Sequence, residues 1–296
     1  MLRGIIDIGS NSIKGFIYTE SGDSFSSVWS HHCYTKMYSY IGESGLSDEG
    51  FEALVRDVSL LETLMTREGC PPQVFFATAG LRDSANRDDI MRRFRERTGH
   101  EIDLLSPMEE ALCDMTSMRY FSGVNRALGM DMGGGSAQFF EYDGERLGRI
   151  MSLPIGALKI KEMFVKGDVP SAAEEEAIRS YVKDTLGQFG PYETDVICAM
   201  GGSIVETVKL ADIHSFPFRV AFDVIEELKE TLEGMEDVSG YLKSVCPGRE
   251  TTILPAVISY LAIADHFGAK ELVVLSNGVR EGYYIRHMLG KGKEDE

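Results

Sequence analysis

The stretch MDMGGGSAQFFEYDG, residues 130–144, places three consecutive glycines between two apolar runs that look like paired strands. Glycine loses the most backbone freedom on folding and packs no side chain, so this triplet is costly unless something needs a bare backbone. One explanation is a tight hairpin with a bulge. The other is a turn whose consecutive N–H groups point into one concavity and bind an anion.

A second turn of the same kind lies near the N-terminus. IDIGSNS, residues 6–12, parallels MDMGGGS, residues 130–136, and Asp7 and Asp131 hold equivalent places in the two turns. Two matched turns favour phosphate binding over a simple hairpin. Together with the order of the elements around them, they also predict two related βββαβα halves that meet at a cleft. Strand-like runs come in two sets of three: 3–8, 13–19 and 24–37, then 127–132, 137–142 and 146–153.

Other elements follow from periodicity and from helix start signals such as Ser47, which is a candidate N-cap. Helices are expected at 48–65, 86–98, 107–120, 171–188, 222–233 and 251–267. Further strands are expected at 73–79, 101–105, 195–200 and 271–275. The lysine and acid tail after Gly290 is expected to be frayed.

The chain has 296 residues, which fits two domains, and we expect them at residues 1–124 and 125–296. Its apolar and charged fractions, 43% and 26%, are those of an ordinary soluble globular protein. Five cysteines stand singly without a CxxC pair, so neither a disulfide framework nor a zinc cage is indicated. A reducing cytoplasm fits best.

The formal net charge of -17 argues against nonspecific binding to DNA, RNA or acidic membranes, because the long-range field repels polyanions. The first apolar run meets Asp7 almost at once, which is wrong for a signal peptide or a spanning helix. Any phosphate substrate must therefore be held locally. Backbone N–H groups, a few arginines and a divalent metal are able to do so.

Six segments, in order through nearly the whole chain, resemble the exopolyphosphatase and guanosine pentaphosphate phosphatase family: IDIGSNS at 6–12, ATAGLRD at 77–83, PMEEA at 107–111, MDMGGGSAQ at 130–138, SLPIGALK at 152–159 and NGVREG at 277–282. The resemblance implies the α/β fold of actin, sugar kinases and the Hsp70 ATPase, with two ribonuclease H-like domains facing an interdomain cleft. Each domain would hold a mixed five-stranded sheet with helices. Longer family members carry extra C-terminal helical domains, which the resemblance does not reach.

The resemblance also implies residues that bind phosphate, and for Arg82 the forked donors of a guanidinium suit paired oxygens. For Lys14 the alternative is a merely solvated lysine. Asp131 and Asp7, which precede the two turns, would hold Mg²⁺ or another divalent cation against phosphate oxygens. The implied phosphate-binding residues are Ser10, Asn11, Ser12, Lys14, Thr78, Arg82, Gly133, Gly134, Gly135 and Ser136.

Two neighbouring acids, Glu109 and Glu110, have different expected roles. Glu109 lies three places after the candidate cap Ser106, so it can reach back to its own helix terminus. The family motif aligns its catalytic glutamate with Glu110, which would act as general base on the attacking water. The alternative for Glu110 is an acid that only complements the helix dipole.

One departure from the family affects the second catalytic position. Most members read DIGGGSTE, whereas this chain carries Ala137 and Gln138. The Gln138 amide can orient a water, but it cannot take a proton and is a weaker metal ligand than a carboxylate. Related nucleoside di- and triphosphate hydrolases also carry glutamine here, so Gln138 is expected to act with Glu110, with a changed metal affinity or substrate preference.

Three further features have two interpretations each. The turn Gly201-Gly202-Ser203 either frames a nucleobase or only ends a strand. Arg249 and Arg280 either contact a ligand or form interdomain salt bridges.

The leading hypothesis is a cytoplasmic, magnesium-dependent phosphoanhydride hydrolase that releases terminal phosphate from short inorganic polyphosphate or guanosine pentaphosphate. An alternative is a phosphate or alarmone sensor that binds without turnover, motivated by Ala137 and Gln138. A third is a sugar or acetate kinase of the same fold. Relatives of this fold often pair through the second domain, which makes a homodimer one expectation.

Overall fold

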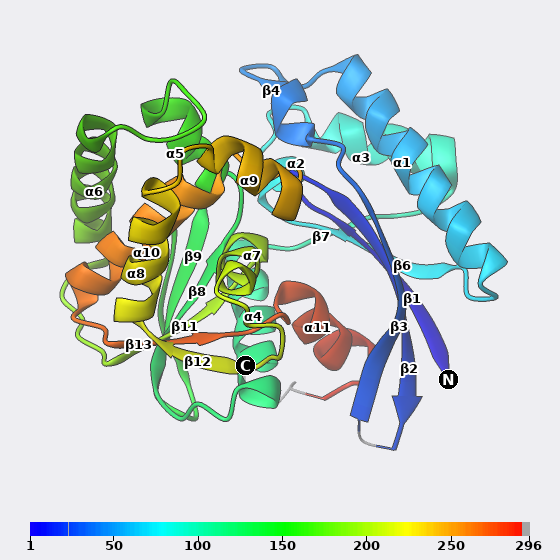
Figure 1. Cartoon of the computed structure of the whole chain (residues 1–296). Helices are drawn as coiled ribbons and strands as arrows, with labels where there is room; N and C mark the ends of the chain where they lie inside the picture. The colour runs from blue at the N-terminus through cyan, green and yellow to red at the C-terminus, as the bar shows by residue number, and fades with distance from the viewer. Residues whose placement is uncertain (23, 292–296) are drawn as a thin grey trace. The chain divides into compact units, whose positions relative to one another are not determined.

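The structure is a computed structural model that describes residues 1–22 and 24–291 (Figure 1). It divides into two compact units, Met1–Pro107 and the chain from Met108 onward. The division lies earlier than the boundary expected at 124/125, because helix α4 (Pro107–Phe121) belongs to the second unit. Apolar side chains of α4 join a core made by strands of that unit: Ala111, Met115 and Met118 pack with Met200, Val273 and Leu275.

The first unit is built on a five-stranded mixed sheet in the order β3-β2-β1-β6-β7. The first three strands are antiparallel neighbours, and β6 and β7 run parallel to β1 and β6 respectively. The strands are β1 (Leu2–Ile8), β2 (Ile13–Ser21), β3 (Ser24–Cys33), β6 (Pro72–Ala77) and β7 (Asp103–Leu104), with a small separate pair β4 (Ile41–Gly42) and β5 (Gly45–Leu46).

Helix α1 (Asp48–Arg67) supplies most of the helical half of this unit's core. Ser47 caps it as expected, since the Ser47 hydroxyl accepts a bond of 3.1 Å from the Gly50 N–H. Its apolar residues recur every three or four places and pack against the sheet, as periodicity predicted. The other helices of this unit are a 3₁₀ turn at Met37–Tyr40, α2 (Ala79–Arg82) and α3 (Arg87–Thr98).

The expected strand at 24–37 ends early, at Cys33. Beyond it the backbone turns, and Lys36 adopts a left-handed conformation with φ 51°. The N–H groups of Lys36 and Tyr38 then donate to the carbonyls of Asn11 and Ser10, at 2.9 and 3.1 Å. The chain leaves the sheet here to satisfy the carbonyl groups of the turn between β1 and β2.

The second unit contains a six-stranded sheet in the order β10-β9-β8-β11-β13-β12, one strand more than the five that were expected. The added strand is β12 (Phe218–Ala221), which is only four residues long and lies antiparallel to β13 at the edge. So short a run gives little alternation to detect. The other strands are β8 (Ala127–Met132), β9 (Ala137–Tyr142), β10 (Leu147–Leu153), β11 (Val196–Met200) and β13 (Glu271–Val274).

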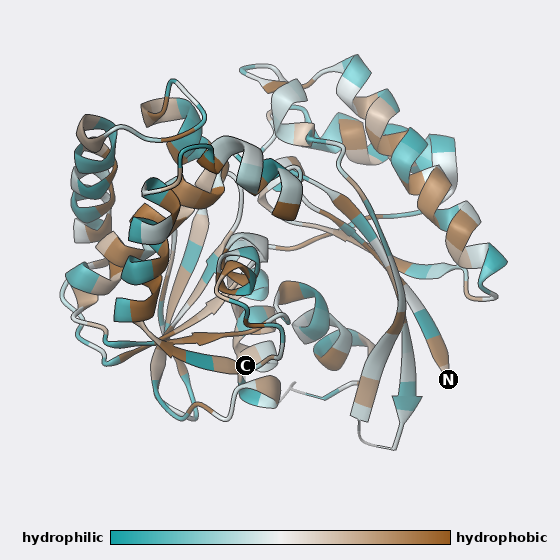
Figure 2. Ribbon diagram, in the orientation of Figure 1, coloured by the Kyte–Doolittle hydropathy of each residue, from teal (hydrophilic) through white to brown (hydrophobic). Residues whose placement is uncertain are grey.

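Successive side chains along these strands point to opposite faces of the sheet, so each face has its own core cluster. One face packs beneath α10 (Ile253–Phe267), whose residues are buried nearly all round and which is the brown, apolar helix of this unit in Figure 2. The other face packs against α4. The remaining helices are α5 (Ala157–Phe164), α6 (Ala172–Leu186), a 3₁₀ turn at Gly187–Phe189, α7 (Gly202–Leu210), α8 (Phe222–Glu233), α9 (Val238–Val245), α11 (Val279–Tyr283) and a π turn at Tyr284–Met288.

The internal repeat predicted from the two turns is present in the register of the strands. Asp7 pairs with Lys14 across β1 and β2, and Asp131 pairs with Gln138 across β8 and β9. Each hairpin closes with the same backbone bond, from Gly9 N–H to Ser12 O at 3.1 Å and from Gly133 N–H to Ser136 O at 2.9 Å. Position 138 is thus the counterpart of Lys14, and the two hairpin tips differ in chemistry.

Across residues 1–22 and 24–291, no helix has the length and apolar character that a membrane crossing requires. The tail that was expected to fray lies outside the described residues from position 292 on.

Candidate active site

The glycine turn between β8 and β9 leaves its amide hydrogens and its carbonyl oxygens in different situations. The carbonyls are taken: Ala157 N–H donates to Gly133 O at 3.1 Å, and Leu158 N–H donates to Gly134 O at 3.0 Å. Within the part of the chain that the structure describes, the N–H groups of Gly134 and Gly135 donate to no protein atom. A turn with its acceptors occupied and its donors unused is suited to an anion.

Nothing in the protein itself requires glycine at the last two places of the triplet. A Cβ atom on Gly135 would meet no atom within 4 Å, and one on Gly134 would make an ordinary contact of 3.8 Å with the Leu158 side chain. Neither residue has a positive φ. By contrast, a Cβ on Gly156 would lie 2.3 Å from Gly134 O, so packing requires that glycine. Close approach of a ligand to the bare backbone accounts for the triplet better than the fold does.

In the matching turn of the first unit, between β1 and β2, the carbonyl oxygens are likewise occupied by backbone N–H donors. Its carbonyl groups at Ser10 and Asn11 accept the bonds from Tyr38 and Lys36 described above. Gly80, which opens the segment after β6, lies against the turn, since a Cβ there would be 2.6 Å from Ser10 Oγ. Ser10, one of the predicted phosphate-binding residues of this turn, is therefore packed against the ATAG segment within one unit.

Arg82 is buried and already makes contacts within its own unit. Its Nη1 donates to Leu105 O at 3.0 Å, and its Nε donates to Asp83 Oδ1 at 3.1 Å. Arg82 thus has a structural role, joining α2 to the residue that follows β7, and its contact with phosphate stays a prediction. Thr78 begins α2 without a side-chain capping bond.

In the second unit, two of the predicted catalytic residues are in contact. Gln138 Nε2 donates a hydrogen bond of 3.1 Å to Glu110 Oε2, and both side chains are buried, with 4% and 9% exposure. Gln138 Oε1 is buried and finds no hydrogen-bond partner in the described residues. Glu109, on the other hand, is exposed. The bond joins two segments 28 residues apart in sequence and brings the PMEEA helix to the glycine hairpin.

A third acid, Asp114, was missed in the sequence analysis. It is fully buried, and within the described chain neither of its carboxylate oxygens accepts a well-formed hydrogen bond, with the backbone N–H of Val279 as the nearby donor. Burial raises the pKa of Asp114 well above its ordinary value, and neighbouring carboxylates add to this: Asp131, Glu110 and Glu281. The available signal was its spacing, because Glu110 and Asp114 are four residues apart and so share one face of α4.

Two glycines border the carboxylate of Asp131. A Cβ on Gly201, which has φ +101°, would lie 2.6 Å from Asp131 Oδ1. A Cβ on Gly278 would lie 3.8 Å from Asp131 Oδ2 and 3.6 Å from Asp114 Oδ1. The bare Cα of Gly278 is therefore flanked by two carboxylates. Glu281 closes this loop, accepting a bond of 3.1 Å from the Gly278 N–H and pairing with Arg280 Nε at 2.9 Å.

Asp131 and Asp114 can supply part, but not all, of the ligand set of a Mg²⁺ ion. Nowhere in residues 1–22 and 24–291 do three His, Cys, Asp or Glu side chains converge closely enough to hold a metal by themselves. Mg²⁺, however, is usually bound by one or two carboxylates, substrate phosphates and several waters. Asp131, with the unpartnered carboxylate of Asp114 nearby, meets that requirement. The assignment of Asp7 to the metal stays a prediction.

The Gly201-Gly202-Ser203 turn has a structural task of its own. Arg249 Nη1 donates to Ser203 Oγ at 3.1 Å, and a Cβ on Gly202 would lie 2.2 Å from Arg249 Nη2. Gly202 therefore makes room for the guanidinium of Arg249. Both Arg249 and Arg280 have partners within the second unit.

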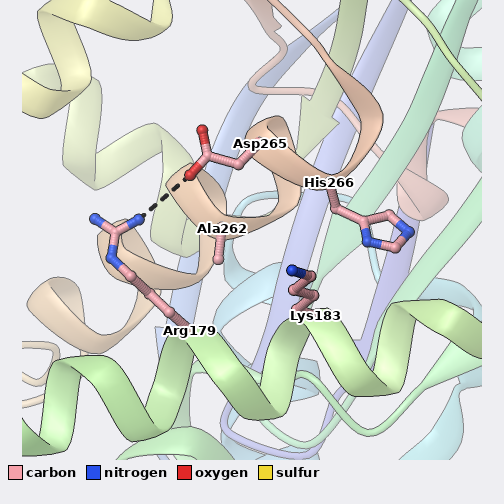
Figure 3. A pocket seen from close by; sticks show the side chains of 5 residues that line it. All are labelled: Arg179, Lys183, Ala262, Asp265 and His266. Carbon is pink, nitrogen blue, oxygen red and sulfur yellow. Dashed lines mark ion pairs between the residues drawn. The ribbon is translucent and has the colours of Figure 1, made fainter.

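A separate small pocket of about 210 Å³ lies between α6 and α10 (Figure 3). Arg179 points at Asp265 there, with 3.6 Å between Nη1 and Oδ2, and also pairs with Glu175. Burial, aided by the charge of Lys183, lowers the pKa of His266. The predicted site residues are not among those that line this pocket, so we leave it outside the candidate site.

The sequence profile of the Ppx/GppA phosphatase family matches residues 17–291. The chain belongs to the Ppx/GppA phosphatase family. Among the solved structures similar to this Ppx/GppA chain is the Aquifex aeolicus family member, with a TM-score of 0.82, 21% identity and 98% of both chains covered. An exopolyphosphatase from Cytophaga hutchinsonii gives a TM-score of 0.84 at 13% identity, covering 98% of this chain and 99% of the other. The expected two-domain, actin-like fold is confirmed.

Relatives of this Ppx/GppA chain are distant in sequence. Exopolyphosphatase 1 of Mycobacterium tuberculosis is 24% identical over 192 residues, which are 64% of this chain and 56% of the relative. The bifunctional 3-dehydroquinate synthase/phosphatase of Fusobacterium nucleatum is 22% identical over 93% of this chain and 45% of the relative. The chain thus spans about half the length of the curated relatives it matches.

Proposed function

We propose that the chain is a phosphoanhydride hydrolase that releases terminal phosphate from short inorganic polyphosphate or from guanosine pentaphosphate. The observation that carries this proposal is the buried hydrogen bond between Gln138 and Glu110, next to a turn with unused N–H groups. Family membership and the similarity to exopolyphosphatases support it.

In this mechanism Glu110 is the general base. The Gln138 amide donates to one carboxylate oxygen and keeps Glu110 in a fixed orientation, because a charged acceptor strengthens such a bond. The attacking water gives its proton to Glu110, while Gln138 Oε1, which needs a donor, accepts the second hydrogen of the same water. The water oxygen bonds to the terminal phosphorus as the bond to the bridging oxygen breaks.

Phosphate oxygens would be bound by the turn between β8 and β9, through the N–H groups of Gly134 and Gly135 and the hydroxyl of Ser136. Asp131 would hold Mg²⁺, which when bound spreads the negative charge that develops on the phosphate oxygens. The first-unit residues implied by the resemblance stay predictions, and so does Asp7. Those residues are Ser10, Asn11, Ser12, Lys14, Thr78 and Arg82.

The test is phosphate release from short polyphosphate and, separately, from guanosine pentaphosphate, with magnesium and with a chelator. We expect release from at least one substrate that depends on the metal. No release from either, with a folded protein, would reject the proposal.

A sensor that binds without turnover is the second candidate, and the amide of Gln138 in place of a carboxylate is the observation that favours it. Calorimetry that shows tight nucleotide binding, together with no phosphate release, would support the sensor and reject the hydrolase. A cytoplasmic location, the absence of nucleic-acid and membrane partners and a homodimer stay predictions.

A further inference from the structure

Asp114 is expected to destabilise the folded state. Its carboxyl group has 0% exposure, and neither oxygen accepts a well-formed hydrogen bond from the described residues, although the backbone N–H of Val279 is near enough to lower its pKa. A buried carboxyl group without a charge partner destabilises a fold, because its charged form loses hydration that nothing replaces. Other buried residues of α4, such as Met115 and Met118, are apolar and pack into the core without this cost. A buried acid at this place is therefore better explained by a ligand than by stability.

The neighbours of Asp114 raise the cost further. Asp131 and Glu110 are both near enough for their charges to act on it. The Asp114 Oδ1 and Asp131 Oδ2 atoms lie 3.6 and 3.8 Å from one point, the place where a Cβ would stand on Gly278. Two like charges that face one small space repel each other unless a cation or a proton lies between them. Because residue 278 is a glycine, its own side chain does not enter that space, which the Met200 Cβ borders at 3.8 Å.

We propose that Asp114 and Asp131 together hold one divalent cation in the second unit, before any substrate binds. The sequence expectation paired Asp131 with Asp7, and Asp114 is the acid that the structure adds. A cation there would offset the negative charges of Asp131, Glu110 and Glu281, which act on the Asp114 carboxyl group. The inference rests on the proposed function only in taking this cation to be the one that serves phosphate release.

The test is binding of Mn²⁺ to the substrate-free full chain, followed by electron paramagnetic resonance of the free ion. Wild type should bind one tight Mn²⁺ per chain. Asp114→Asn should weaken that affinity at least tenfold, and Asp184→Asn, which changes an exposed aspartate on α6, should leave it unchanged. Affinity of Asp114→Asn within twofold of wild type would overturn the inference.

Thermal unfolding gives a second readout, in which we expect the Asp114 variant to be more stable than wild type when no cation is present. Without a cation, Asp114→Asn should melt at a higher temperature than wild type, since it removes a buried acid that must either stay protonated or repel Asp131 and Glu110. With Mn²⁺, wild type should gain melting temperature and the variant should not. If Asp114→Asn does not fold, Asp114→Ala repeats both measurements, because it removes the carboxyl group without adding an amide that needs partners. Equal gains in wild type and in the Asp114 variant would again overturn the inference.

These outcomes are separable from those of the phosphate-release assay. Loss of Mn²⁺ binding in Asp114→Asn, combined with no phosphate release by wild type, would support the cation site and reject the hydrolase. Metal-dependent phosphate release by wild type, combined with unchanged Mn²⁺ binding in Asp114→Asn, would do the reverse.

Discussion

The side-chain amide of Gln138 donates a hydrogen bond of 3.1 Å to the buried carboxylate of Glu110. An amide N–H can make this contact only as a donor, so it favours the charged form of Glu110, which is the form that a general base needs. A carboxylate at position 138 could keep the same contact only by sharing a proton with Glu110. In the proposed mechanism, an amide at position 138 therefore lets Glu110 act as a base at a lower pH than a second carboxylate would.

Gln138→Glu should move the acidic limb of the pH–rate profile to higher pH, because two carboxylates in contact raise the pKa at which the second loses its proton. Hydrolysis at neutral pH should fall and recover under alkaline conditions. Gln188→Glu, which adds the same charge at an exposed position, should leave the profile in place. An unshifted profile in Gln138→Glu would show that the two side chains do not work as a pair.

Gly135→Ala should separate ligand binding from folding. Its Cβ meets open space and its φ is ordinary, so the melting temperature should stay close to that of wild type. The same methyl group would obstruct an anion on the turn, and we expect KM for polyphosphate to rise about tenfold, or about 1.4 kcal/mol. Gly187→Ala is the matched control, since that glycine also borders open space without a positive φ. An unchanged KM would mean that the anion does not contact this turn.

Lys229 joins three glutamates in the second unit and should stabilise it in a pH-dependent way. Its side chain is 7% exposed and lies 3.0 Å from Glu233 and 3.1 Å from Glu175. Lys229→Met should cost about 1 to 3 kcal/mol of unfolding free energy at neutral pH, less than for a fully buried pair because the glutamates keep contact with water. Lys243→Met, at an exposed position of α9, should have little effect.

The pH dependence of that cost follows from Glu175. Burial alone would raise the pKa of Glu175, but the bonds from Arg179 and Lys229 leave it below the ordinary value of 4.5. Its contribution is therefore present above 4.5 and lost as the pH falls through the lowered pKa. Urea unfolding in increasingly acid buffer should show the gap between wild type and Lys229→Met shrinking. A gap that widens in acid would contradict this assignment.

Local patterns of the sequence predicted those parts of the fold that local interactions determine. Strands β8 and β9 have the bounds that were expected, because a glycine turn separates two apolar runs. The helix cap at Ser47 could also be predicted from the sequence, since the capping bond joins Ser47 and Gly50, which are three places apart. The repeat of Asp7 and Asp131 followed from two matched turns.

The remainder depends on contacts between segments far apart in the chain. Asp114 reads as one polar residue on a helix, and only the strands and loops that surround it make it a buried acid without partners. Besides its φ of +101°, Gly201 is required by the close approach of Asp131 Oδ1 and Met132 O, from a strand about 70 places earlier, which the sequence around Gly201 does not reveal. The early division of the chain likewise comes from α4 packing on strands that follow it.

The central claim is that Glu110 takes the proton from the attacking water, and a single-turnover measurement of phosphate release by Glu110→Gln tests it most directly. The change keeps the shape of the side chain, so folding and substrate binding should persist while release slows by about 10² to 10⁴-fold. Glu109→Gln, the same change at the exposed neighbour, should release phosphate at the wild-type rate. Release by Glu110→Gln within a few-fold of wild type would contradict the account.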